Sequence, residues 1–185
     1  MTDAFLITTA VTIALAFAGY MATYLNGLRL AQRNQRLERV NKQLGELYGP
    51  LYGLIDSETA VFTVFRSIYR PGKHFFDDED DPPSEEDFEA WRMWMTNVFA
   101  PINNRMYELV LSKSDLLIET ESPQCLRDLC AHVVGYQLVM KKWERGDYSE
   151  RMSLLPFPRE ELLQYVAESY NTLKREQAGL LGRMS

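Results

Sequence analysis

The feature that most constrains this 185-residue chain is an uncharged apolar run near its N-terminus. No Asp, Glu, Lys or Arg occurs between Ala4 and Leu28, and the apolar residues would cover every face of a helix. About 20 such residues, at a rise of about 1.5 Å each, cross a hydrocarbon core about 30 Å thick. The run therefore predicts one transmembrane helix, which we assign to residues 1–28.

A cleaved signal peptide is the alternative interpretation of this run, because Ala16, Phe17 and Ala18 have the small-x-small form of a cleavage site. Signal peptides begin with positively charged residues. Here Thr2 and Asp3 precede the run, and the basic residues follow it. The order of the charges favours an uncleaved anchor.

Basic residues gather just after the apolar run and predict its orientation. Five of them follow it within a few helical turns, namely Arg29, Arg33, Arg36, Arg39 and Lys42. Flanks rich in Lys and Arg stay in the cytoplasm, so we expect a single-pass inner (plasma) membrane protein with its N-terminus outside and its C-terminal domain cytoplasmic. The same residues are candidates for binding anionic lipid headgroups, since each contributes about 1 kcal/mol near the leaflet. The simpler interpretation is that they only set the topology.

A row of alanines suggests that the apolar helix associates with itself. Ala10, Ala14, Ala18 and Ala22 recur every four residues and therefore share one helical face. Small side chains at this spacing let a second transmembrane helix approach closely, which predicts a homodimer. The alternative is coincidence, because alanine is common in membrane spans and is a weaker signal than glycine.

Residues 29–49 predict a basic juxtamembrane helix with a short heptad seam. The seam consists of Leu30, Leu37, Leu44 and Leu51, with Val40, Leu47 and Leu54 between them. It is short for a coiled coil, and Gly49-Pro50 is expected to interrupt the helix. Packing within the chain and dimerisation through the seam both remain open.

Residues 50–185 predict one helical domain. Their apolar residues repeat with a helical period, and Pro101 predicts a kink within one helix. The expected boundaries are turn or capping residues, at Pro71-Gly72, Ser84 with Asp87, Ser122-Pro123, and Pro156 with Pro158. The predicted fold class is therefore all-α, with one N-terminal transmembrane helix followed by a cytoplasmic helical bundle.

No motif points to a cofactor, a metal or a catalysed reaction. Cys125 and Cys130 have the spacing of neither a redox pair nor a zinc half-site, and free cysteines suit a reducing compartment. His74 and His132 have no recognisable partner nearby in the sequence. The acidic residues 77–81 lack the Gly and Glu positions of a calcium loop. The net charge of -6 argues against a nucleic-acid partner. We expect no enzyme activity.

Three segments in the C-terminal third carry a resemblance. They are C-x-H-V-V-G-Y from Cys130 to Tyr136, W-E-R-G-D-Y-S-E from Trp143 to Glu150, and Phe157-Pro158. The stretch resembles a group of small, uncharacterised bacterial membrane-anchored helical proteins. The resemblance implies a bacterial source and a recurring helical module, and it supplies no site residues.

Two functions fit these observations. The first is a membrane-anchored interaction or scaffold module whose helical domain binds a second copy or an unknown protein partner. The alternative is a small membrane effector, an oligomer that is channel-like or perturbs the membrane. That alternative rests on the polar residues within the apolar run, Thr8, Thr9, Thr12 and Thr23.

Overall fold

The computed structural model describes residues 2–72, 75–76, 81–153 and 155–182. The described residues contain helices and no strand, so the all-α fold class is confirmed. The elements are α1 (Thr2–Lys42), η1 (Gln43–Tyr48), α2 (Gly49–Tyr69), α3 (Glu85–Trp94), η2 (Met95–Phe99), α4 (Ala100–Ser112), η3 (Ser114–Leu116), α5 (Gln124–Trp143) and α6 (Arg159–Gly182).

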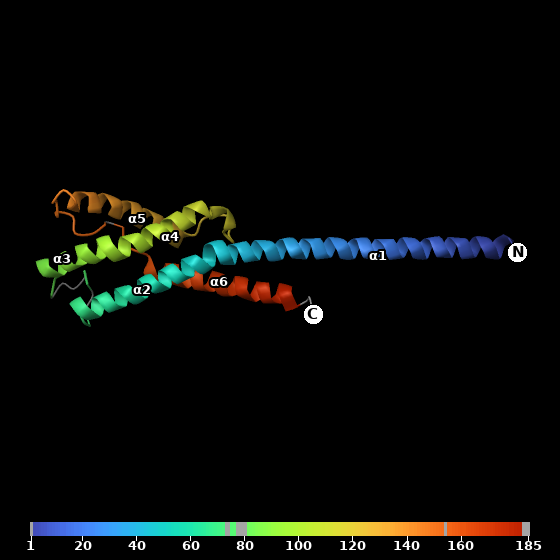
Figure 1. The fold of residues 1–185 in the computed structure, drawn as a ribbon, viewed down its shortest axis with the longest axis horizontal. Helices are drawn as coiled ribbons and strands as arrows, with labels where there is room; N and C mark the ends of the chain where they lie inside the picture. Colours follow the sequence, from blue (N-terminus) through green and yellow to red (C-terminus); the bar gives the residue numbers. More distant parts are fainter. Residues whose placement is uncertain (1, 73–74, 77–80, 154, 183–185) are drawn as a thin grey trace.

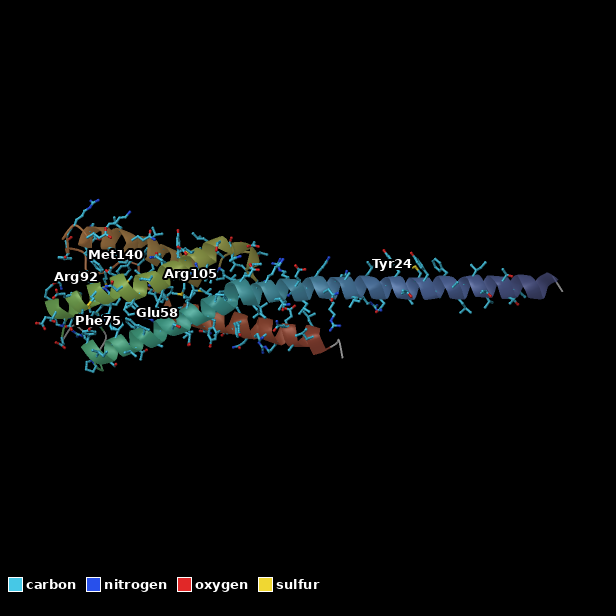
Figure 2. All side chains as sticks on the ribbon, in the orientation of Figure 1. Tyr24, Glu58, Phe75, Arg92, Arg105 and Met140 are labelled. Carbon is cyan, nitrogen blue, oxygen red and sulfur yellow. The ribbon has the colours of Figure 1, made fainter. Side chains whose placement is uncertain are left out.

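The first three elements join into one uninterrupted helix from Thr2 to Tyr69. Its N-terminal half projects away from the other helices as an isolated rod, and its C-terminal half lies within the domain (Figure 1). Figure 2 shows Tyr24 on the projecting part, far from Glu58 and Phe75 in the domain. Val40 is the first fully buried residue of this helix, and Arg33 and Leu37 before it are partly buried.

The helix does not end at Gly49-Pro50, contrary to the sequence-based expectation. In a regular α-helix a proline ring clashes with the carbonyl four residues earlier and leaves one backbone bond unmade. Here η1 is a π turn, in which the Gly49 N–H donates to the Leu44 carbonyl five residues earlier. This wider turn accommodates Pro50. Glycine is needed beside it, because a Cβ atom at Gly49 would lie 2.5 Å from the Leu44 oxygen.

A π turn also accommodates the second proline within a helix, Pro101. The π turn η2 precedes it, and the Ala100 N–H donates to the Met95 carbonyl five residues earlier. The irregularity expected at this proline thus takes the form of a π turn, and α3, η2 and α4 form one helix from Glu85 to Ser112. Its start is the predicted capping box, in which the Asp87 N–H donates to the Ser84 hydroxyl at 3.2 Å.

Helix α6 runs antiparallel to the long helix and covers its middle. Its first residue, Arg159, bonds to Glu58 near the middle of α2. Farther along, the rings of Tyr170 and Tyr52 stack 5.4 Å apart. Near its end, the Gln177 side chain donates to Asn41 at 2.7 Å. The C-terminal end of α6 therefore returns beside the residues that follow the apolar run.

The core consists of two clusters. One joins the long helix to α4, α5 and α6, and it takes up the heptad seam from Val40 through Leu44, Leu47 and Leu51. That part of the seam packs within the chain, whereas Leu30 is 50% exposed. The second cluster is aromatic and includes Phe65, Trp91, Phe99, Tyr136 and Trp143.

Candidate functional site

The projecting part of α1 is the first candidate site. It belongs to the one helix in the described part of the chain that is long and apolar enough to cross a membrane. The side chains described from Ile7 to Tyr20 are all exposed, and large apolar ones such as Phe17 are 65% exposed. No other element of the described chain covers this surface. An apolar rod of this length requires a nonaqueous environment or a partner.

The residues proposed for self-association lie on this exposed rod. Ala10, Ala14, Ala18 and Ala22 are all exposed on α1, and their role in dimerisation stays a prediction. Two of the threonines use their hydroxyls within the helix. Thr12 donates to the Thr8 carbonyl at 2.9 Å, and Thr23 donates to the Gly19 carbonyl at 3.0 Å.

Contacts within the chain engage three of the five basic residues that follow the rod. An Arg33 Nη atom donates to the Leu180 carbonyl, and Arg36 pairs with Glu176 on α6, with an Nη–Oε2 distance of 2.9 Å. Lys42 pairs with Glu38 at 3.0 Å. Arg29 and Arg39 are exposed. Lipid-headgroup binding by the five residues stays a prediction. Lipid headgroups would have to compete with the α6 partners of Arg33 and Arg36.

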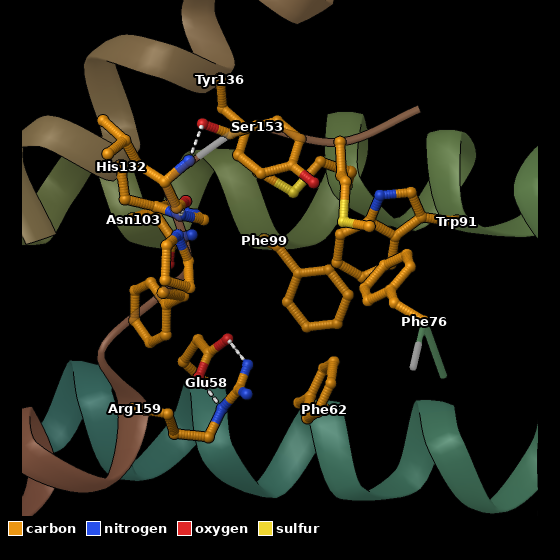
Figure 3. A pocket seen from close by; sticks show the side chains of 15 residues that line it. Glu58, Phe62, Phe76, Trp91, Phe99, Asn103, His132, Tyr136, Ser153 and Arg159 are labelled. Atoms are coloured by element: carbon orange, nitrogen blue, oxygen red, sulfur yellow. Dashed lines mark hydrogen bonds and ion pairs between the residues drawn. The ribbon is translucent and has the colours of Figure 1, made fainter. Parts of the chain in front are cut away.

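A cavity of about 450 Å³ inside the domain is the second candidate site. It lies between α2, the α3–η2–α4 helix, α5 and the loop that connects α5 to α6 (Figure 3). Its volume falls within the range of small-molecule sites. Met152 and Leu155 of the connecting loop are 39% and 46% exposed and mark the mouth.

One continuous face of the α3–η2–α4 helix lines the cavity with Trp91, Met95, Phe99 and Asn103. In a regular α-helix, at about 100° per residue, the first and last of these would lie about 120° apart around the axis. The π turn between them accommodates one extra residue, which reduces this separation to about 20°. The π turn at Pro101 therefore aligns four cavity-lining side chains over three turns of helix.

A buried ion pair forms part of the cavity wall. Arg159 donates to both carboxylate oxygens of Glu58, at 2.9 Å from Nε and 2.6 Å from an Nη atom. The Glu58 residue is 2% exposed. The Arg159 guanidinium also lies 3.6 Å from the centroid of the Phe62 ring, so the carboxylate occupies its edge and an aromatic ring occupies one face.

The titratable groups opposite the ion pair are neutral near neutral pH. Burial lowers the pKa of His132, and the nearby Arg159 charge lowers it further, while a bond to the Leu155 carbonyl opposes them. That bond joins Nδ1 to the carbonyl oxygen at 2.7 Å, so the neutral ring carries its proton on Nδ1. Burial raises the pKa of the Tyr136 hydroxyl to about 12.

Two of the three segments that carry the resemblance line this cavity. His132 and Tyr136 line its wall from α5, and Phe157 lines it from the connecting loop. Trp143 holds the start of that loop, because its Nε1 atom donates to the Glu150 carbonyl at 2.7 Å. Gly135 lets the loop approach α5, since a Cβ atom there would lie 2.5 Å from the Ser153 hydroxyl.

Two buried polar atoms in the wall make no hydrogen bond of ordinary geometry with the described residues. They are Oδ1 of Asn103, an acceptor, and Nε1 of Trp91, a donor that interacts with the nearby Tyr136 hydroxyl and lowers its pKa slightly against the effect of burial. Trp91 is 6% exposed and Asn103 is 3% exposed. A buried polar atom without a partner is rare and costs about 1–3 kcal/mol. Sequence reasoning did not single out Asn103 or Glu58.

The remaining predictions of chemistry concern cysteine, histidine and acidic residues. Cys125 and Cys130 are free, and burial raises the pKa of both thiols, which makes them less reactive. His74 and residues 77–80 lie outside the described residues. Elsewhere in the described chain, no group of three His, Cys, Asp or Glu side chains has the arrangement of a metal site.

Comparison of this chain with models of protein families, with curated proteins and with solved structures found no match.

Proposed function

We propose that this protein is a single-pass membrane-anchored interaction module whose helical domain lies in the cytoplasm. One observation carries the proposal: the exposed apolar rod and the core of the domain are parts of the same uninterrupted helix, from Thr2 to Tyr69. A tether of this kind holds the domain at a fixed height and orientation, which a flexible linker does not do.

The height of the domain above the proposed membrane follows from helix geometry. Thirty residues separate Leu28, at the end of the apolar run, from Glu58 in the domain. At about 1.5 Å per residue, this length of helix corresponds to about 45 Å. The domain therefore reaches well beyond the headgroup region, where it is accessible to cytoplasmic partners. The basic residues between Arg29 and Lys42 favour the cytoplasmic side.

The outer face of α5 supports an interaction role. Val134 and Leu138 lie one turn apart on it and are 50% and 60% exposed. A scaffold that binds a second copy or another protein needs no further chemistry. The effector alternative has less support, because Thr12 and Thr23 direct their hydroxyl groups to backbone carbonyls of their own helix. We likewise propose that the protein is not an enzyme.

Site-specific photo-crosslinking in cells tests the proposal. A photoreactive amino acid at position 138 of the full chain should yield a discrete adduct with a second copy or another protein. The same residue in place of Asn171, an exposed polar position on α6, is the matched control and should yield little adduct. Equal diffuse labelling from both positions, or none from either, would contradict the interaction module.

A further inference from the structure

The cavity between α2, the α3–η2–α4 helix and α5 has the features of a binding site for a small molecule. It is lined by aromatic rings, and Figure 3 shows Trp91, Phe99, Phe62 and Tyr136 among them. Its volume of about 450 Å³ is more than a side-chain packing defect provides. We propose that it binds an uncharged, elongated aromatic molecule taken from the aqueous phase.

The charge of the occupant follows from the wall. The Glu58 carboxylate and the Arg159 guanidinium neutralise each other through two hydrogen bonds. Two ring centroids, those of Phe62 and Phe157, lie 3.6 and 5.2 Å from the guanidinium carbon. This cation is therefore already engaged along its edge and by aromatic rings. With no uncompensated charge among the described wall residues, burying an ionic ligand here would be unfavourable.

The polar groups of the occupant follow from Asn103 and Trp91. The Asn103 oxygen offers an acceptor to an N–H or O–H group, and the Trp91 N–H, which makes no bond of ordinary geometry with the Tyr136 hydroxyl beside it, can be shared with an acceptor on the ligand. The two side chains lie on opposite sides of Phe99 in Figure 3. A ligand that satisfies both atoms must therefore be elongated, with an acceptor toward one end and a donor toward the other. The aromatic rings between them select a flat apolar body.

The source of the occupant follows from the position of the cavity. Glu58, in its wall, lies about 45 Å along the continuous helix from Leu28, at about 1.5 Å per residue. A lipid or quinone that remains in the bilayer does not reach so far. The mouth, at Met152 and Leu155, is exposed to solvent. The ligand must therefore enter from water. The binding site itself goes beyond the proposed function, whereas the exclusion of a bilayer ligand rests on the proposed membrane anchor.

Titration of the full chain in detergent with a series of flavones tests this proposal. The probe 4′-hydroxyflavone is uncharged, elongated and aromatic, with a carbonyl acceptor and a hydroxyl donor. We expect saturable binding to one site, followed by tryptophan fluorescence and by the rise in thermal unfolding temperature. The 4′-methoxy analogue, which lacks the donor, should bind at least fivefold more weakly, and flavone-4′-carboxylate, which is charged, should not bind measurably.

Four variants connect the binding to Trp91 and Asn103. Trp91→Phe and Asn103→Leu should each weaken 4′-hydroxyflavone binding at least tenfold. The matched controls are Trp94→Phe and Asn104→Leu, which alter side chains outside this cavity, bonded to Tyr69 and Gln137 respectively. Both controls should bind within twofold of the wild type.

Thermal unfolding without ligand supplies a second, independent measurement. Because the Asn103 oxygen has no partner, Asn103→Leu should raise the unfolding temperature while it weakens binding. A lower unfolding temperature for Asn103→Leu would mean that ordered water satisfies the amide, and it would overturn the ligand assignment. Failure of all three flavones to saturate, equal affinity of the carboxylate, or unchanged affinity in both cavity variants would overturn it as well.

Discussion

Removing one partner of the Glu58–Arg159 ion pair should destabilise the domain strongly. The perturbation is Arg159→Met, which keeps a long apolar side chain but leaves the Glu58 carboxylate, 2% exposed, without its two charge-assisted bonds. Breaking a buried ion pair from one side costs about 3–5 kcal/mol of unfolding free energy. Loss of the contact between the guanidinium and the Phe62 ring adds to this cost.

The expected change is large enough for thermal unfolding to measure. For a chain of this size, 1 kcal/mol corresponds to about 2–4 °C in Tm, so Arg159→Met should lower Tm by about 6–20 °C. Circular dichroism of the full chain in detergent at 222 nm reports the transition, because the described fold is helical throughout its regular elements. The exposed pair between Lys113 and Glu46 is the control, and Lys113→Met should change Tm by about 2 °C or less.

A double variant separates the ion pair from simple loss of packing. Glu58→Leu combined with Arg159→Met removes both charges, so no ion remains buried without a partner. Such replacements are often neutral, and the double variant should recover most of the lost stability. If Arg159→Met lowers Tm by less than about 2 °C, or if the double variant is no more stable than the single one, the pair does not behave as a buried ion pair.

Three further predictions concern the π turn, His132 and the alanine row. In a urea titration, Gly49→Ala should lower the unfolding free energy by about 1–3 kcal/mol, because its Cβ atom would lie 2.5 Å from the Leu44 oxygen. The control Gly53→Ala, with open space around it, should be neutral or slightly stabilising. Burial lowers the pKa of His132 below its value in the unfolded chain, so its contribution to stability is present above about pH 6.5 and is lost as the pH falls. Between pH 7.5 and 5.5, Tm should therefore decrease less in His132→Gln than in the wild type. Equal decreases would contradict this assignment. Ala14→Leu with Ala18→Leu should abolish crosslinking between copies within the membrane, and a double variant that crosslinks like the wild type would exclude the alanine face.

Local signals in the sequence predicted the helix boundaries well. Ser84 and Asp87 define a capping box through two side chains three residues apart, so a short window contains all the information. The same holds at Pro123, directly before α5, and Pro158, directly before α6. The helix end predicted at Gly49-Pro50 was wrong. Proline normally breaks an α-helix, and no simple sequence pattern predicts that a π turn will accommodate it.

The cavity could not be predicted because its partners are distant in the sequence. The His132 ring bonds to the backbone carbonyl of Leu155, and a backbone acceptor leaves no signal in the side-chain sequence. Glu58 and Arg159 meet only because α6 folds back along α2. The one available signal was the spacing of Trp91, Met95, Phe99 and Asn103 at every fourth residue, with Pro101 between the last two. That spacing predicts one face only when the extra residue of the π turn is included.

Labelling of single cysteines in intact cells tests the membrane-anchored placement most directly. In a background of Cys125→Ser and Cys130→Ser, one variant carries Thr2→Cys and the other carries Glu121→Cys, which replaces an exposed residue before α5. A membrane-impermeant maleimide should modify only the first variant in intact cells and both variants after permeabilisation. Labelling of Glu121→Cys in intact cells, or labelling of neither variant until the membrane is opened, would contradict a single-pass anchor with its domain in the cytoplasm.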